Sequence, residues 1–424
     1  MKKALFLIQA VTMILGLTAC TRQVSAEVIK SNKPRVVSPA ISQTEMASLV
    51  DGNSAFAFNL YQALKDTDGN LFYSPYSISE ALAMTYGGAR GDTEKQMAGA
   101  LHFSLMQNQL HPAFNSLDQE LAKRGQGAKG KDEKGFRLHV VNAIWGQKDF
   151  KFTSEYLDLL AQQYGAGLRI LDFINATEQS RATINQWVSD QTESKIKDLI
   201  PRGAIDPMTR LVLTNAIYFN AAWKYPFTVE STSNGKFHLL NGSEISVPLM
   251  KQTKSFGYAQ GDNYQLVELP YDGNELSMVI ILPRLEQFKA TEASLNSQQV
   301  NSMIRSIQSR QMILTMPKFR FESSFGLKKT LSGMGMPVAF STDADFSGMD
   351  GKRDLYITDV IHKSFIYVDE AGTEAAAATG VIMGTTSMPA APIEVTIDHP
   401  FIFLIRDINT GTVLFVGRVL SPGL

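Results

Sequence analysis

The sequence has very little cysteine, because Cys20 is the only one in 424 residues. No disulfide bond can form within a single chain, and a metal site built from two or more thiolates is excluded. The chain also lacks His-x-x-x-His spacing and the Gly-x-Ser-x-Gly motif of many hydrolases. We therefore predict no metal, no cofactor and no catalytic residue. A Ser/His/Asp triad is defined by geometry alone and stays open, but nothing in the sequence favours one.

Neither sign of charge is in excess, since 40 Lys and Arg residues face 41 Asp and Glu residues. This balance gives no general attraction to nucleic acid, and we predict no nucleic-acid partner. Hydrophobic residues make up 44% of the chain and charged residues 19%, which is typical of a globular protein with a large core. No linker divides residues 44–424, so we predict a single domain there.

The N-terminus carries export signals rather than a membrane span. Met1-Lys-Lys precedes the apolar stretch Ala4–Leu17, which is too short to predict a transmembrane helix. A basic start followed by a short apolar run is typical of a signal peptide, which we place at residues 1–19.

Leu17-Thr-Ala-Cys20 resembles a bacterial lipobox, in which the cysteine thiol receives a diacylglycerol and becomes the mature N-terminus. Two or more acyl chains give stable anchoring, so we expect contact with a membrane only through Cys20. Ordinary secretory cleavage near Val24-Ser-Ala26 is the alternative. Residues 20–43 are mostly polar and are expected to form the lipidated N-terminus and a tether. The protein is thus expected to be exported, as a cell-envelope lipoprotein or into the extracellular space.

A long connection near the C-terminus, at about residues 370–392, is unlike an ordinary loop. It follows an apolar, strand-like run, Leu355–Val368, and precedes a second strand-like segment, Ile393–Ile397. No charged residue occurs from Ala375 to Pro392, where small, apolar and hydroxylic residues dominate. A connection of this length inside a compact domain is usually functional.

With the period of two of a β-strand, this connection has one face fit for burial and one that carries its only charge. The sequence therefore describes a loop in one state and a strand in another, and Gly372 supplies flexible backbone where the strand would begin. The first face holds Thr373, Ala375, Ala377, Thr379, Val381, Met383 and Thr385; the second holds Glu374, Ala376, Ala378 and Gly380.

Glu370-Ala-Gly-Thr-Glu-Ala-Ala-Ala-Ala-Thr379 resembles the hinge of an inhibitory serpin, and His399–Arg406 with Gly411–Arg418 resembles the closing strands of that family. Asn70–Met84, Ile184–Pro201 and Asn215–Trp223 are similar to further serpin segments, in the expected order. The segment Ile184–Pro201 belongs to a helix that we predict over residues 176–199 and expect to end before Pro201. The resemblance implies an α+β serpin fold with about nine helices, three β-sheets and an exposed reactive-centre loop.

The resemblance also implies which residues form the functional sites. The hinge would comprise Glu370, Gly372, Thr373, Glu374, Ala375, Ala376, Ala377, Ala378 and Thr379. The region where the main sheet opens would comprise Ser74, Ser77, Asn215 and His362 at its centre, with Trp223 near its top.

Counting from Gly372 along the family's loop places the reactive bond at Thr386–Ser387. Counting back from His399-Pro400 moves it about three residues later. The bond is therefore placed only within Met383–Ala390, with Met383 and Met388 as the alternatives. No Lys or Arg lies nearby in either register. The expected partners are therefore elastase-like, subtilisin-like or papain-like proteases, and trypsin-like ones are disfavoured.

The implied function is the trapping of serine, and also some cysteine, endopeptidases by a suicide-substrate inhibitor that is itself no enzyme and is expected to be a monomer. The protease would cleave the loop, form an acyl-enzyme, and be distorted as the hinge inserts into the main sheet. Two other functions stay open: a non-inhibitory serpin that acts as a surface carrier or binding lipoprotein, and an adhesin that uses Arg90-Gly91-Asp92.

Overall fold

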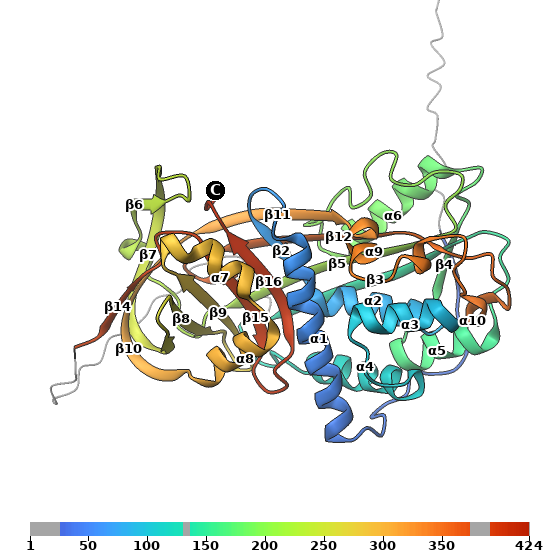
Figure 1. Cartoon of the computed structure of the whole chain (residues 1–424), viewed down its shortest axis with the longest axis horizontal. Helices are drawn as coiled ribbons and strands as arrows, with labels where there is room; N and C mark the ends of the chain where they lie inside the picture. Colours follow the sequence, from blue (N-terminus) through green and yellow to red (C-terminus); the bar gives the residue numbers. More distant parts are fainter. Residues whose placement is uncertain (1–25, 130–135, 374–390, 424) are drawn as a thin grey trace, which may run out of the picture.

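The computed structural model describes residues 26–129, 136–373 and 391–423. Figure 1 shows an elongated molecule with a barrel-like half on one side and a half of long strands covered by helices on the other. Ten α-helices occur in the described residues, close to the expected number: α1 (Gln43–Leu64), α2 (Pro75–Tyr86), α3 (Gly91–Leu101), α4 (Gln107–Leu121), α5 (Ser154–Tyr164), α6 (Thr177–Gln191), α7 (Phe288–Ser294), α8 (Ser297–Arg305), α9 (Lys328–Gly333) and α10 (Ser347–Asp350).

The main sheet is seven-stranded, with the order β1-β4-β3-β5-β13-β12-β11. Its two central long strands, β5 and β12, run parallel, and β3 and β11 pair antiparallel on their outer sides. The strands are β1 (Glu27–Ile29), β3 (Arg137–Gln147), β4 (Leu168–Leu171), β5 (Leu211–Ala222), β11 (Phe319–Gly326), β12 (Ile357–Val368) and β13 (Gly372–Thr373).

The remaining strands form one nine-stranded sheet, in the order β14-β10-β7-β8-β9-β15-β16-β2 with β6 paired to β7. Hydrogen bonding therefore joins the described strands into two sheets, where the resemblance implied three. The reason is β7, whose first residues pair with β6 and whose last pair with β8. The strands are β2 (Leu71–Tyr73), β6 (Ser233–His238), β7 (Glu244–Gln260), β8 (Tyr264–Pro270), β9 (Leu276–Pro283), β10 (Gln308–Pro317), β14 (Ile393–Thr396), β15 (Phe401–Asp407) and β16 (Val413–Val419).

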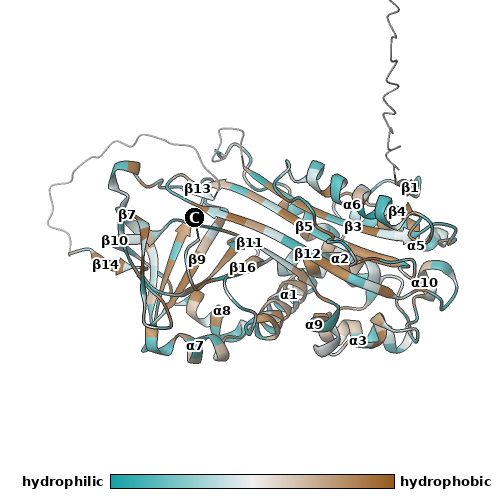
Figure 2. Ribbon diagram, turned by 90° about the horizontal axis from the view of Figure 1, so that it is seen from above, coloured by the Kyte–Doolittle hydropathy of each residue, from teal (hydrophilic) through white to brown (hydrophobic). Residues whose placement is uncertain are grey.

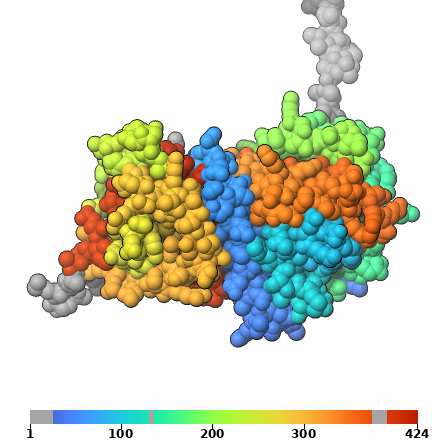
Figure 3. Space-filling view, in the orientation of Figure 1, coloured from blue at the N-terminus to red at the C-terminus, as the bar shows by residue number. Residues whose placement is uncertain are grey.

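Apolar residues cover both faces of the main sheet. A large core joins one face to α1, α2 and the nine-stranded sheet, and a smaller core lies between the other face and α6. Figure 2 shows α6 on one side of the strands and α1, α3 and α9 on the other, and in Figure 3 α1 crosses the surface between the two halves. Burial on both faces explains why β5 is a nearly continuous apolar run instead of an alternating one.

The helix expected to continue to residue 199 ends at Gln191, so this prediction was wrong at its C-terminal end. Glu193, Ser194 and Asp198 have positive φ angles, which an α-helix does not allow. The side chain of Thr192 accepts a hydrogen bond from the backbone N–H of Ile196 and so turns the chain back toward the sheet. The apolar residues after this turn lie in the small core instead of on a longer helix.

The segment before α1 is in contact with the body of the protein. Residues 27–29 form β1 and extend the edge of the main sheet by pairing with β4. Farther along, Arg35 donates hydrogen bonds to Asn115 and Asp118 on α4, at 2.8 and 2.6 Å. The sequence indicated a tether through residue 43, and the structure shows residues 26–42 crossing β4, α5 and α4. Within the described residues, no helix combines the length and apolarity needed to cross a membrane.

Candidate functional site

The main sheet is split at one end by the start of the predicted hinge. The parallel pairing of β5 with β12 extends only to Ile217 and Ser364. Beyond it, Gly372 and Thr373 lie between the two strands and pair with β5, and Thr373 also pairs with Val368 of β12. The first described residues of the predicted hinge thus occupy a gap between β5 and β12.

Gly372 is required at this position by close backbone contact. A Cβ atom added to it would lie 2.2 Å from the carbonyl oxygen of Ala221 and 2.8 Å from the Cα of Ala222. Its φ of +152° is also one that L-residues rarely adopt. Only glycine lets the chain pass this close to β5 as it enters the sheet.

Thr373 is 2% exposed, and its hydroxyl is 2.9 Å from that of Tyr271. The ring of Tyr271 stacks on Trp223 at a centroid distance of 4.7 Å. The backbone N–H of Trp223 donates to Ala371 O and its indole N–H donates to Asp369 O, at 2.9 and 3.0 Å. Trp223 therefore holds the turn that leads into the hinge.

Glu370 fixes the other side of this turn. Its carboxylate accepts from Lys318 at 2.9 Å and from the Thr232 hydroxyl at 2.7 Å. Burial alone would raise the pKa of Glu370, but these two donors outweigh it and hold the pKa below its ordinary value. The carboxylate is therefore charged at neutral pH and ties the base of the loop to β10–β11 and to the segment before β6.

At the centre of the sheet, the predicted sheet-opening residues Ser74, Ser77, Asn215 and His362 lie together, fully buried. Ser74 caps α2, and its backbone N–H donates to His362 Nε2 at 3.3 Å. His362 Nδ1 lies against the Asn215 side-chain oxygen, and the Asn215 amide nitrogen donates to Ser77 Oγ. Burial lowers the pKa of His362 to about 3, so the ring is neutral. This contact between β12 and β5 must break if another strand is to pass between them.

Two residues at this centre were absent from the sequence-based prediction. Asn142 on β3 accepts from Asn215 and from Ser77, the latter at 3.1 Å, and donates to Glu80 of α2 at 2.8 Å. A glutamate within a helix whose residues are all buried was the available signal for Glu80. Asn142 offered a signal of the same kind, because it is the only polar residue in the apolar strand run of residues 140–145.

Several predicted residues lie outside the part of the chain that the structure describes. They are the hinge residues Glu374, Ala375, Ala376, Ala377, Ala378 and Thr379, the reactive-bond candidates Met383, Thr386, Ser387 and Met388, and the lipidation candidate Cys20. In the described ranges, no group of three or more His, Cys, Asp or Glu side chains is arranged to hold a metal ion.

A family model described as "Serpin (serine protease inhibitor)" matches residues 51–422. The chain belongs to the serpin family. Serpins are a family of protease inhibitors and generally not enzymes. Leukocyte elastase inhibitor A of Mus musculus is 41% identical over 389 residues, which cover 89% of this chain and all of the mouse protein. An uncharacterized serpin-like protein of Thermococcus kodakarensis is 39% identical over 92% of this serpin and 90% of its own length.

Solved structures show the same fold. Native tengpin, a thermophilic serpin, matches with a TM-score of 0.83 and 29% identity over 94% of this chain and all of its own. Human thyroxine-binding globulin, solved in complex with its hormone, matches with a TM-score of 0.80 and 28% identity over 90% of this serpin and all of its own chain. The serpin fold expected from the sequence is thereby confirmed.

Proposed function

We propose that this serpin traps proteases covalently, by cleavage of its reactive-centre loop and insertion of the hinge into the main sheet. The observation that carries the proposal is the position of Gly372 and Thr373 between β5 and β12. The sheet has already opened to admit the first residues of the loop, and the residues that follow are small. Alanine and threonine present little bulk or charge to resist entry between two strands.

The chemistry is that of an ordinary acyl transfer stopped half-way. The protease nucleophile attacks the carbonyl carbon of Thr386, the bond to the Ser387 nitrogen breaks, and that nitrogen leaves as a free amine. The loop is then joined to the protease as an ester, or as a thioester for a cysteine protease. Insertion of residues 374–385 as a new strand carries the protease along and distorts its active site before water can release it. Serpin loop insertion of this kind releases strain that is stored in the uncleaved protein.

The proposed targets are proteases that accept small or apolar residues before the cleaved bond. Thr386 is uncharged and no Lys or Arg lies near it, which suits elastase-like and subtilisin-like enzymes and some papain-like ones. Relatives about 40% identical are named leukocyte elastase inhibitors, which supports the same preference. Cleavage with an elastase, followed by mass spectrometry of the fragments, will identify the bond: Thr386–Ser387, or one that begins at Met383 or Met388.

We also propose that the mature protein is exported and anchored through a lipidated Cys20, with secretion into the medium as the alternative. The support is the sequence of the N-terminus alone. Expression of the full chain in a bacterium, followed by mass spectrometry of the mature N-terminus, tests it. A Cys20 that carries acyl chains supports the anchor, and an N-terminus that begins after Ala26 excludes it.

The trap is tested with residues 26–424, an elastase, denaturing electrophoresis and a thermal melt. We expect a complex that survives SDS, and a loop-cleaved protein that melts well above the uncleaved one. Cleavage with no complex and no rise in melting temperature would reject the trap and favour a carrier serpin.

A further inference from the structure

A carboxyl group lies beneath the centre of the main sheet. Glu80 belongs to α2, all of whose residues are buried, and is itself 8% exposed. One of its oxygens, Oε2, accepts a hydrogen bond from the side-chain amide of Asn142 at 2.8 Å. Buried carboxyl groups are costly, and the trapping chemistry does not use this one. Its contact with Asn142 indicates what it does.

The contacts of Asn142 fix which end of its side-chain amide faces β5. Its nitrogen donates to Glu80 Oε2 and to the backbone oxygen of Ser77, at 2.8 and 3.2 Å. Its oxygen is thereby turned toward the Asn215 amide nitrogen and the Ser77 hydroxyl, from which it accepts. If the amide were reversed, the two nitrogens of Asn142 and Asn215 would face each other and neither could accept.

The orientation of the Asn215 amide on β5 in turn determines which nitrogen of His362 on β12 carries the proton. Since the Asn215 amide nitrogen is used toward Asn142 and Ser77, its oxygen faces His362 Nδ1 and requires a proton on that nitrogen. His362 Nε2 is then free of a proton and accepts from the Ser74 backbone N–H. One direction of donation runs through the whole chain of contacts and ends on two acceptors, the Ser77 backbone oxygen and the carboxyl of Glu80.

We propose that Glu80 is a positioning residue for the opening of the main sheet: it helps to orient the Asn142 amide within the hydrogen bonds that join β3, β5 and β12, and its ionisation, which places a charge beneath the closed sheet, favours opening. The functional part of this inference rests on the proposed trapping mechanism. The orientation part does not, because it concerns the uncleaved protein alone.

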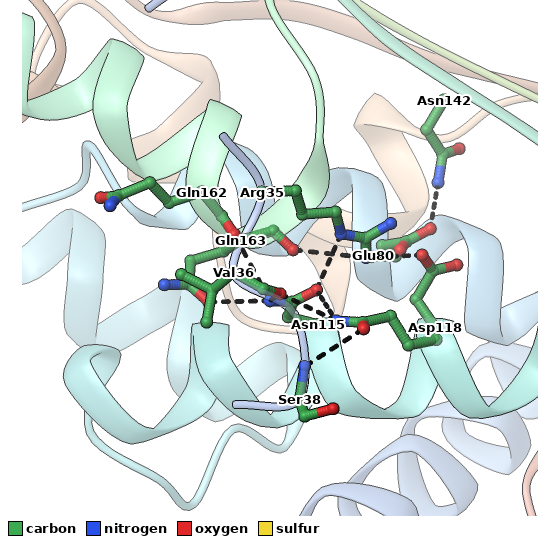
Figure 4. A network of polar contacts seen from close by, with 10 residues as sticks. Arg35, Val36, Ser38, Glu80, Asn115, Asp118, Asn142, Gln162 and Gln163 are labelled. Carbon is green, nitrogen blue, oxygen red and sulfur yellow. Dashed lines mark hydrogen bonds and ion pairs between the residues drawn. The ribbon is translucent and has the colours of Figure 1, made fainter. Parts of the chain in front are cut away.

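The surroundings of Glu80 favour its neutral form. Asp118 on α4 adds a negative charge nearby, Arg35 beside it adds a positive one, and the phenols of Tyr76 on α2 and Tyr164 on α5 are neutral. Arg35 is engaged by Asp118 at 2.6 Å and forms no hydrogen bond with Glu80 among the described contacts. Figure 4 shows Glu80, Asp118 and Arg35 together, with Asn142 beyond Glu80. Burial, and then Asp118, raise the pKa of Glu80 to about 8.

The direction of the pH effect follows from this. If opening exposes Glu80, the open form releases its proton near pH 4.5, whereas the closed form holds it until about pH 8. Between these values the open form binds fewer protons, so opening becomes easier as pH rises and levels off above 8. The upper limit is about a tenfold change in the opening equilibrium per pH unit.

The test compares Glu80→Gln, which keeps an acceptor for Asn142 without titrating, with Glu80→Met, which keeps the length and removes the acceptor. Glu155→Gln, at an exposed position of α5, is the matched control. Two readouts need no protease: the ¹⁵N shifts of the His362 ring, which report its tautomer, and the rate of urea-induced unfolding from pH 6 to 9. Complex formation with an elastase is measured afterwards.

We expect wild type and Glu155→Gln to unfold faster as pH rises, and Glu80→Gln to show a flatter profile with an unchanged His362 tautomer. Glu80→Met should lose the single tautomer; if it does not fold, the smaller Glu80→Ala, which also removes the acceptor, is measured in its place, and Glu80→Gln still decides the ionisation part. A wild-type pH profile in Glu80→Gln overturns the ionisation part, and an intact tautomer in folded Glu80→Met overturns the orientation part. If both readouts behave as expected but wild type forms no complex with elastase, the trapping mechanism fails and the role of Glu80 in the sheet stands.

Discussion

The substitution Thr373→Arg tests whether the gap between β5 and β12 is the entry point for the loop. Thr373 is 2% exposed and pairs with both strands, so the new side chain would enter a closed space beside Tyr271 and Trp223. The two carboxylates of this turn are already engaged, Glu370 by Lys318 and Asp369 by the backbone N–H of Ala371. A guanidinium buried without a partner costs several kcal/mol, and we take about 3 kcal/mol as a cautious value.

In the uncleaved variant this penalty should keep residue 373 out of the sheet, so that it must be overcome during insertion. Insertion then slows by about a hundredfold or more, because each 1.4 kcal/mol is a factor of about ten. Deacylation of the protease is unaffected by the change and then overtakes insertion. The expected result is a serpin that is cleaved by elastase as a substrate, with little or no SDS-stable complex. Stoichiometry of inhibition and denaturing electrophoresis measure this directly.

The matched control is Thr253→Arg, which makes the same substitution at an exposed position of β7. It should inhibit as wild type does. A second variant, Thr373→Val, keeps the shape and loses only the hydrogen bond to Tyr271, so it should inhibit with a small loss. If Thr373→Arg forms the complex as fast as Thr253→Arg does, the loop does not enter the sheet here and the reasoning is wrong.

Three further perturbations test other parts of the structure. Lys318→Met removes the ion pair at the base of the loop and should lower the stability of the uncleaved protein by about 1–2 kcal/mol, measured by urea unfolding; an unchanged midpoint would show that the pair does not hold the turn. Burial lowers the pKa of both His111 and His362 to about 3, while unfolded histidines take up a proton near 6.5. The unfolded state therefore binds more protons in this interval, and stability should fall as pH drops from 6.5 to 3, less steeply in His362→Gln; equal slopes would contradict the assignment. Arg35→Gln removes a partly exposed pair with Asp118 and should cost about 1 kcal/mol, seen as increased proteolysis before α1; wild-type resistance would mean that β1 and the contacts of Lys33 and Val36 hold the segment without Arg35.

Local pattern was sufficient for much of the fold. The strands β12 and β14 were expected from residue type and period, and the structure has both. The segments that contain α2, β15 and β16 were expected from the resemblance to serpins, and the structure has them as well. The loop was recognisable because its composition is unusual for a connection: no charge and few turn residues over a long stretch. These are properties of neighbouring residues, which a single sequence displays.

The sequence was a poorer guide where the partners of a residue lie far away in the chain. A helix to residue 199 agreed with local pattern, but Ile196 and Ile200 find more burial against the main sheet than a straight helix would give them. Residues 26–42 looked like a tether because their partners are not periodic neighbours: β1 pairs with β4, and Arg35 reaches α4.

The functional centre shows the same division most clearly. The sequence by itself determined a neutral, small-residue loop behind a glycine, because those properties are local. Only the tertiary structure decided that Asn142, Asn215 and His362, on three different strands, share one line of hydrogen bonds and that Glu80 is one of the two acceptors at its end. Hydrogen-bond direction depends on how strands from distant parts of the chain are placed side by side, and strand register is fixed only when the whole sheet forms.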